Sequence, residues 1–306
     1  MKKNNELIGH LSCFVAYAIF GINVVTCKDL TASHALSPIA TFTLRALGAG
    51  ALFWIISLFT PREKVEKRDY PKILAASFLG FFLTQLTFLA AIPQITPMTS
   101  SILSALTPIY TMFIAAVAVK EPITWKKAGG VALSFVGIVF LVLNSSHGSA
   151  SGAQTNSLWG VLLMVGNGLS FALYLGIFRP LIQKYSVVTF MKWIFLFAFL
   201  MALPFSAKEL VCDVDWTLLK GRAGFDLFFL IFCATFISYF LIPVGQKNIR
   251  PTLVSMYNYL QPLLAIALSI CVGMDTLSWQ KVVSAIAVFA GVIIVSFSKK
   301  KEESLS

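Results

Sequence analysis

Charged side chains are scarce in this sequence, and acidic side chains are the scarcest. Only 12% of the 306 residues are charged, whereas 58% are hydrophobic. A soluble domain carries roughly 25% charged residues, about twice this share. The composition therefore excludes an ordinary soluble fold. In a membrane protein, the net charge of +11 indicates which side of the membrane the basic segments occupy. We therefore expect no nucleic acid partner.

Motifs of catalysis and metal binding are also missing. The three histidines and five cysteines show no metal-ligand or disulfide spacing, and no GxxxxGK[ST], HExxH or GxSxG motif occurs. No acidic residue lies deep in an apolar run, so a buried carboxylate relay for protons is absent from the sequence. His10 is the only embedded group that titrates near neutrality. The sequence thus predicts no enzyme, no metal and no cofactor.

Long apolar runs dominate what is present. A helix needs about 20 residues to cross the hydrocarbon core, where its backbone groups must be bonded internally. Runs of this length lie at 7–27, 36–58, 186–206, 226–247, 251–273 and 280–298, with two more between Lys72 and Lys120 and two between Lys127 and Arg179. The sequence therefore predicts an all-α membrane protein with ten transmembrane helices.

The distribution of basic residues predicts the orientation. With ten helices and a cytoplasmic N-terminus, 17 of the 24 Lys and Arg residues fall in cytoplasmic segments and five in outer segments. Cytoplasmic loops are enriched in these residues, and a count wrong by one helix would destroy the bias. We therefore expect a multi-pass protein of the cell (inner) membrane with both termini in the cytoplasm.

The chain repeats itself at an offset of 154 residues. The stretch AVKEPITWKKAGG begins at Ala118, and VGMDTLSWQKVVS begins at Val272. The same offset aligns Pro97 with Pro251, Pro108 with Pro262, Trp125 with Trp279 and Gly137 with Gly291. Only the first stretch is rich in lysine, as expected if the second lies on the other side of the membrane.

Each half then holds five helices, and an odd number inserts the two halves in opposite orientations. The domain prediction is a first repeat at 1–143, a Gly/Ser-rich linker at 144–157, a second repeat at 158–298 and a cytoplasmic tail at 299–306.

The two repeats resemble the EamA family of the drug/metabolite transporter superfamily. The resemblance rests on LTPIYTMFIAAVAVKEPITWKKAGGVALSFVGIVFLV, on LQPLLAIALSICVGMDTLSWQKVVSAIAVFAGVIIVS and on PIATFTLRALGAGALF. It covers nearly the whole chain and departs from the family pattern at Asp275 and Thr276, where a Glu-Pro pair is expected. The resemblance implies a secondary transporter, often an exporter of amino acids or related metabolites.

A pair of prolines points to the binding site. Pro108 and Pro262 lie near the middle of the fourth and ninth predicted helices. A helical proline kinks the helix and frees the carbonyl four residues before it, here those of Ser104 and Asn258. Carriers with inverted repeats bind substrate near the bilayer midplane at interrupted helices. We therefore expect Ser104 and Asn258 to contact the substrate, although the prolines could instead only shape the bundle.

Polar residues on neighbouring helices complete the predicted binding site. They are Thr107, Gln261, Gln85, Tyr239, Asn23 and Tyr174. In the alternative interpretation, these side chains only form hydrogen bonds between helices and do not contact a substrate.

Arg45 is an ionisable residue within a predicted helix, which is a functional hypothesis by default because its burial is costly. One interpretation has Arg45 attracting a substrate carboxylate. The other has it capping backbone carbonyls or extending toward the membrane surface.

The chain is interpreted as a secondary transporter for small metabolites such as amino acids or related compounds, and the resemblance implies export. Its expected partners are a small-molecule substrate and the lipid bilayer, while proton coupling, exchange, passive facilitation and the oligomeric state are left open. The competing interpretations are a membrane-embedded enzyme acting on lipid-linked substrates and a scaffold or receptor. The enzyme would need clustered carboxylates, histidines or a nucleophile at one membrane face, and the sequence offers none.

Overall fold

The computed structural model describes residues 2–32, 36–95, 100, 103–145, 157–214, 216–219, 221–261, 263–264 and 279–298. All regular structure within these residues is helical. Six helical stretches are long and apolar enough to cross a bilayer: Asn4–Asn23, Pro38–Leu58, Lys67–Gln94, Leu158–Ile177, Val187–Asp213 and Arg222–Asn248. The predicted all-α membrane fold is confirmed for the described residues, while the count of ten spans and the cytoplasmic termini stay predictions.

The elements of the first half are α1 (Lys2–Ala32), α2 (Pro38–Leu58), η1 (Lys67–Asp69), α3 (Tyr70–Ser77), η2 (Phe78–Leu83), α4 (Thr84–Ala91), η3 (Ile92–Gln94), α6 (Thr107–Ala118) and α7 (Trp125–Ser145). Those of the second half are α8 (Leu158–Ile177), α9 (Arg179–Lys184), α10 (Val187–Lys208), η5 (Glu209–Asp213), α11 (Arg222–Ile231), η6 (Phe232–Ile237), α12 (Ser238–Asn248), α13 (Pro251–Met256), η7 (Tyr257–Tyr259) and α15 (Trp279–Ser296).

Serine and proline mark several helix starts. The Ser37 hydroxyl accepts a hydrogen bond from the Ala40 amide at 3.2 Å, and the Ser186 hydroxyl accepts one from the Thr189 amide at 3.2 Å. Proline occupies the first turn of α2, α6, α9 and α13, where a helix lacks an internal partner for the N–H that proline does not have. Local chemistry therefore sets where these helices begin.

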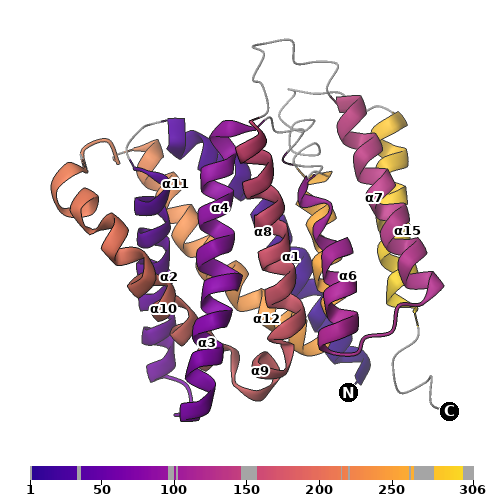
Figure 1. Cartoon of the computed structure of the whole chain (residues 1–306), viewed down its shortest axis with the longest axis horizontal. Helices are drawn as coiled ribbons and strands as arrows, with labels where there is room; N and C mark the ends of the chain where they lie inside the picture. The colour runs from indigo at the N-terminus through magenta and orange to yellow at the C-terminus, as the bar shows by residue number, and fades with distance from the viewer. Residues whose placement is uncertain are drawn as a thin grey trace.

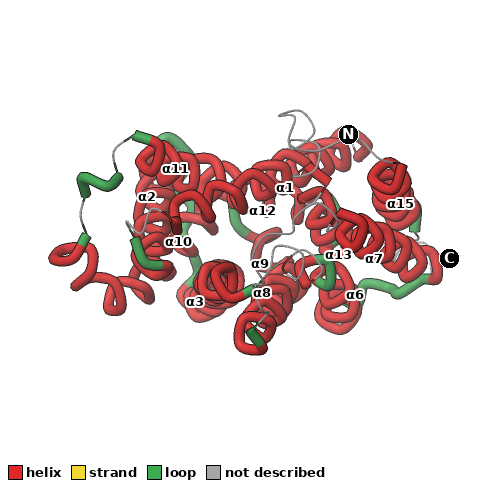
Figure 2. Tube along the Cα trace, turned by 90° about the horizontal axis from the view of Figure 1, so that it is seen from above, coloured by secondary structure: helices red, strands yellow, loops and turns green. Residues whose placement is uncertain are grey.

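The helices pack side by side in one bundle (Figure 1). Seen from above, α7 and α15 lie at one end, and α2, α10 and α11 lie at the other (Figure 2). Between these ends, α1 and α12 run along one long side, and α3, α8 and α6 run along the opposite side. The contacts agree, since α7 packs on α15, α2 on α10, α1 on α12, and α8 on both α4 and α6.

Close contacts between helices occur in matched pairs. A Cβ on Gly9 of α1 would meet the Asn248 Cβ at 2.8 Å, and a Cβ on Gly160 of α8 would meet the Gln94 Cβ at 2.8 Å. Gln94 and Asn248 are 154 residues apart, and the two glycines are 151 apart. The two halves therefore repeat one contact with their roles exchanged.

The pair formed by α7 and α15 follows the same rule. A Cβ on Gly130 would meet the Gly291 carbonyl oxygen at 2.7 Å, and a Cβ on Gly137 would meet the Ser284 carbonyl oxygen at 3.3 Å. Each contact becomes the other when 154 is added to one residue number and subtracted from its partner's. Small residues allow these helix backbones to approach closely.

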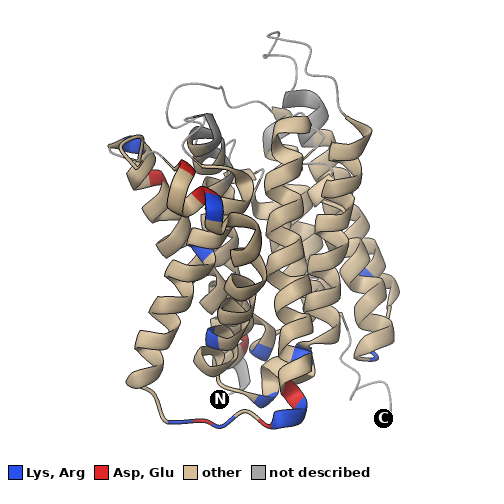
Figure 3. Cartoon of the chain, turned by 60° about the vertical axis from the view of Figure 1, so that its left-hand side comes forward, with Lys and Arg blue, Asp and Glu red and all other residues tan. Residues whose placement is uncertain are grey.

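Charged residues lie mostly toward the two ends of the bundle (Figure 3). At one end, Lys184 Nζ lies 2.6 Å from Asp69 Oδ2 and 2.5 Å from Glu66 Oε1. These hydrogen bonds raise the pKa of the Lys184 ammonium, and the bond from Lys184 lowers the pKa of the Glu66 carboxyl. Both groups therefore stay charged at neutral pH and tie α9 to the turn before α3.

The N-terminal part of α1 and the last turn of α15 lie at the same end of the bundle, because Glu6 and Phe297 line one cavity. The first described helix therefore starts, and the last one ends, at the same face of the bundle.

Candidate functional site

A small central cavity lies between helices of both halves. Its volume is about 70 Å³. Asn167, at the tenth of the 20 positions of α8, lines it, so the cavity is far from either helix end. The lining residues are Phe20, Asn23, Thr84, Gln85, Phe88, Ser104, Thr107, Met164, Asn167, Phe171, Tyr239, Asn258 and Gln261.

The cavity collects most of the residues that sequence reasoning predicted for substrate binding. Seven of those nine line it: Asn258, Gln261, Ser104, Thr107, Gln85, Tyr239 and Asn23. Tyr174 and Arg45 lie outside the lining. The structure thus brings the predicted polar residues together, while their contact with a substrate stays a prediction.

Pairs of polar side chains are hydrogen-bonded along the cavity wall. Gln261 Nε2 donates to Asn258 Oδ1 at 2.9 Å. Gln85 Nε2 donates to the Tyr239 hydroxyl at 3.0 Å, and these two residues are themselves 154 apart. The Gln85–Tyr239 bond therefore joins two positions that the 154-residue offset pairs.

The Gln85–Tyr239 bond follows a π-helical turn in each half. The segments η2 and η6 are offset from each other by 154 residues. The Thr84 hydroxyl donates to the Leu79 carbonyl at 2.6 Å, and the Ser238 hydroxyl donates to the Cys233 carbonyl at 3.1 Å, each five residues back. A π turn occurs often at functional sites, and here one ends two residues before Gln85 and another two residues before Tyr239.

Arg45 supports this wall from behind. It is 0% exposed, and its Nε donates to Thr235 Oγ1 at 2.8 Å while its Nη1 donates to Gln85 Oε1 at 3.0 Å. Its Nη2 has no hydrogen-bond partner among the described residues. Of the two interpretations of Arg45, the one in which it caps carbonyls or reaches the surface is wrong, since Arg45 is buried and bonded to two side chains. Contact of Arg45 with a substrate carboxylate stays a prediction.

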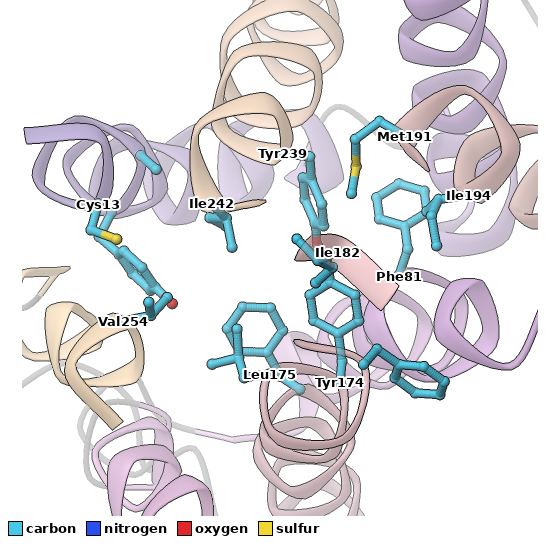
Figure 4. Packing of buried hydrophobic residues seen from close by; sticks show 14 of the residues in the cluster. Cys13, Phe81, Tyr174, Leu175, Ile182, Met191, Ile194, Tyr239, Ile242 and Val254 are labelled. Carbon is cyan, nitrogen blue, oxygen red and sulfur yellow. The ribbon is translucent and has the colours of Figure 1, made fainter. Parts of the chain in front are cut away.

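Tyr174 packs beside the cavity. Its ring lies directly against Gly80, where a Cβ could not fit, and the side chain is 2% exposed. Figure 4 shows Tyr174 close to Phe81 and Tyr239, and the Phe81 and Tyr239 rings meet edge to face with centroids 4.9 Å apart. Tyr174 stacks on Phe171, a residue of the lining, with ring centroids 6.0 Å apart, so it packs behind the cavity wall.

The proline-based prediction concerned two helix kinks. The structure starts α6 at Thr107 with Pro108 in its first turn, and the Leu106 amide donates to the Leu103 carbonyl at 3.1 Å in a turn just before it. The helix is therefore interrupted here, next to Ser104 and Thr107. Pro262 lies outside the described residues, but α13 also stops short of it and continues as the 3₁₀ segment η7.

Sequence reasoning missed the apolar part of the lining, which comprises Phe20, Phe88, Met164 and Phe171. The 151-residue offset that pairs Phe20 with Phe171 could have indicated two of these four residues. In a chain where most residues are apolar, composition does not distinguish a phenylalanine facing a cavity from one facing lipid. Asn167, which the sequence indicated only weakly, also lines the cavity; its Nδ2 donates to the Thr84 carbonyl at 2.6 Å.

Comparisons with known proteins give similarity to transporters in both halves of the chain. A family model described as the EamA-like transporter family matches residues 7–143 and again residues 158–297. An uncharacterized transporter of Archaeoglobus fulgidus is 26% identical over 154 residues, covering 50% of this chain and 52% of that protein, so the match spans about half the length of this relative. The uncharacterized inner membrane transporter YicL of Salmonella typhimurium is 22% identical over 298 residues, covering 96% of each chain.

A crystal structure of another protein has the same fold. It superposes with a TM-score of 0.75 over 97% of each chain at 15% sequence identity.

Proposed function

The chain belongs to the EamA-like transporter family, and from this premise we propose that it is a secondary transporter that exports small metabolites by alternating access. Membrane transport of small molecules is the activity that this membership indicates. Export, ten membrane spans, inverted insertion of the two halves and cytoplasmic termini are the further parts of the proposal. The central cavity between the two halves is the observation that carries it.

The position of the cavity fits alternating access. Transporters with inverted repeats bind substrate at the interface of the repeats, beside interrupted helices. Gln85 and Tyr239 meet across that interface at 3.0 Å, and the break before α6 lies beside the cavity. A rocking motion of one half against the other would change the access to this cavity from one side to the other.

The lining favours a small solute with both polar and apolar parts. Amide and hydroxyl groups share the wall with the rings of Phe20, Phe88 and Phe171. Sites for organic ligands usually measure about 300–1,000 Å³, so the cavity of about 70 Å³ must widen to hold a metabolite. Amino acids and related compounds match this chemistry and are the proposed cargo.

Counterflow tests the proposal. The full chain is reconstituted into liposomes, and entry of labelled amino acids against an unlabelled pool is measured. Asn258→Ala and Gln261→Ala each remove one partner of the 2.9 Å bond in the wall, and we expect each to lower the initial rate about tenfold, the effect of losing one buried polar contact. Gln183→Ala removes an exposed amide of α9 and serves as the matched control.

Unaltered counterflow in both variants, at wild-type abundance, would remove the cavity from the mechanism. No counterflow of any amino acid by the wild-type chain would exclude the proposed cargo. A pH gradient that drives uphill movement separates a proton exchanger from a facilitator.

A further inference from the structure

A second and larger cavity opens at the end of the bundle where α1 begins and α15 stops. Its volume is about 610 Å³, and it shares no lining residue with the central cavity. Its wall is formed by the start of α1, the turn after α6, the start of α9, the turn between α12 and α13, and the last turn of α15. The cavity therefore lies between the two halves.

Basic side chains outnumber acidic ones around this cavity. Lys120, Arg179 and Arg250 line it together with Glu6 and Glu121. Lys120 has a φ of 53°, a left-handed conformation that glycine adopts at less cost.

The carboxylate of Glu121 already has partners within the protein. Its Oε1 lies 2.9 Å from the Nζ of Lys127, which is 0% exposed, and its Oε2 accepts a hydrogen bond from the Thr252 hydroxyl at 3.2 Å. The Arg250 Nε lies 4.0 Å from the same Oε1. Glu121 is thus engaged by Lys127, Thr252 and Arg250, whereas neither Arg179 nor Lys120 forms an ion pair with a carboxylate among the described residues.

Backbone carbonyls hold the two arginines at the cavity. Arg250 Nη2 donates to the Val295 carbonyl at 2.8 Å, and Arg179 Nη2 donates to the Ile249 carbonyl at 3.4 Å. The Nε of Arg179 is buried without a hydrogen-bond partner among the described residues. A guanidinium has five N–H donors arranged to hold a carboxylate or phosphate with two parallel bonds.

We propose that this cavity is a binding site for an oxyanion, a carboxylate or a phosphate, held by Arg179 and Arg250 with Lys120 at its edge. The oxyanion supplies the opposite charge that Arg179 and Lys120 lack among the described residues. Its source is either a soluble organic acid or the headgroup of an anionic lipid. The inference is independent of transport, because it concerns binding at a site that the central cavity does not share.

Binding is tested on the full chain in nanodiscs of neutral phosphatidylcholine. Inorganic phosphate and glutarate are titrated by isothermal calorimetry, with chloride keeping the ionic strength constant. We expect saturable binding that is about tenfold weaker in Arg179→Gln and in Arg250→Gln, since each removes a charge-assisted contact. Lys126→Gln removes an exposed lysine at the start of α7 and should bind as the wild type does.

A second arm identifies the source of the oxyanion. The same titration is repeated in nanodiscs that contain phosphatidylglycerol. Weaker apparent binding of phosphate there, with no such lipid dependence in Arg179→Gln, indicates that a lipid headgroup competes for the site. Binding unaffected by the lipid assigns the site to soluble anions.

The proposal fails if the wild type binds neither soluble anion and no anionic lipid, or if Arg179→Gln binds both as tightly as the wild type. Lys120→Gln guards against misfolding, because Lys120 is exposed and its replacement should weaken binding severalfold in a protein that folds normally. Counterflow through the central cavity is measured separately, so either proposal can fail alone.

Discussion

Arg45 is a cation that is fully buried in the bundle. A buried cation is costly unless hydrogen bonds and an opposite charge compensate it. Arg45 has hydrogen bonds to Thr235 and Gln85, and through Gln85 it reaches Tyr239 at the interface of the two halves. Arg45 lies outside the lining, and we therefore expect it to act by positioning the cavity wall.

Replacing Arg45 with lysine tests this role. A lysine ammonium lacks the planar, forked set of N–H donors of a guanidinium, so lysine cannot contact Thr235 and Gln85 with the same geometry. We expect the free energy of unfolding to fall by about 1–3 kcal/mol, seen as a lower thermal midpoint of the purified protein, together with slower counterflow. Lys192→Arg is the control, since Lys192 lies 4.9 Å from the Trp54 ring centroid and arginine keeps a cation–π contact. A thermal midpoint and a counterflow rate equal to those of the wild type in Arg45→Lys would show that these hydrogen bonds contribute neither to stability nor to transport.

At the scale of elements, the matched contacts decide how closely helices approach. The α7–α15 pair is held together at glycines, with Gly130 against the backbone of Gly291. A Cβ on its neighbour Gly129 would meet no atom within 4 Å, because Gly129 faces outward. Two adjacent glycines on one helix therefore differ only in what they face.

This difference gives a matched pair of substitutions. Gly130→Ala places a Cβ 2.7 Å from the Gly291 carbonyl oxygen and from a methyl carbon of Val295, so the helices must separate. We expect a loss of about 1–3 kcal/mol, measured as a lower thermal midpoint in detergent. Gly129→Ala should leave the midpoint unchanged or raise it slightly, because alanine favours the helix. Equal effects of the two changes would contradict close packing of α7 on α15.

At the scale of the whole molecule, the arrangement of the faces can be tested. Cys212 is exposed in η5, which is joined to the start of α2 by the bond from the Ser37 amide to Glu209 at 2.8 Å. Lys64 is exposed just after the end of α2. A helix of 21 residues separates these two places by about 30 Å, the thickness of the hydrocarbon core.

Thiol labelling in intact cells reads this arrangement. In a chain whose only cysteine is Cys212, a membrane-impermeant maleimide should react without permeabilisation. In a cysteine-free chain carrying Lys64→Cys, the same reagent should react only after permeabilisation, because basic loops stay in the cytoplasm. The reverse pattern would invert the orientation, and labelling of both from outside would mean that α2 does not cross the membrane.

Much of the candidate site could be predicted from the sequence. Asn258, Gln261, Ser104 and Thr107 were found because an offset of 154 residues pairs them beside two prolines, and the structure brings them to one cavity. Tyr174 was expected on the wall as a polar residue of a neighbouring helix, but it lies outside the lining. The symmetry predicts which positions are equivalent, yet it does not say which face of a helix each side chain occupies.

The sequence by itself determined the helical membrane character and the repeated pattern, because hydrocarbon admits only segments whose backbone bonds are satisfied internally. That requirement acts on every stretch of about 20 residues separately, so it is visible without any knowledge of contacts. Tertiary structure alone decided that Arg45 meets Thr235, 190 residues away, that phenylalanines line the central cavity and that two arginines share one cavity with a buried glutamate. Such outcomes depend on the rotation of each helix against its neighbours, and packing across the whole bundle sets those rotations.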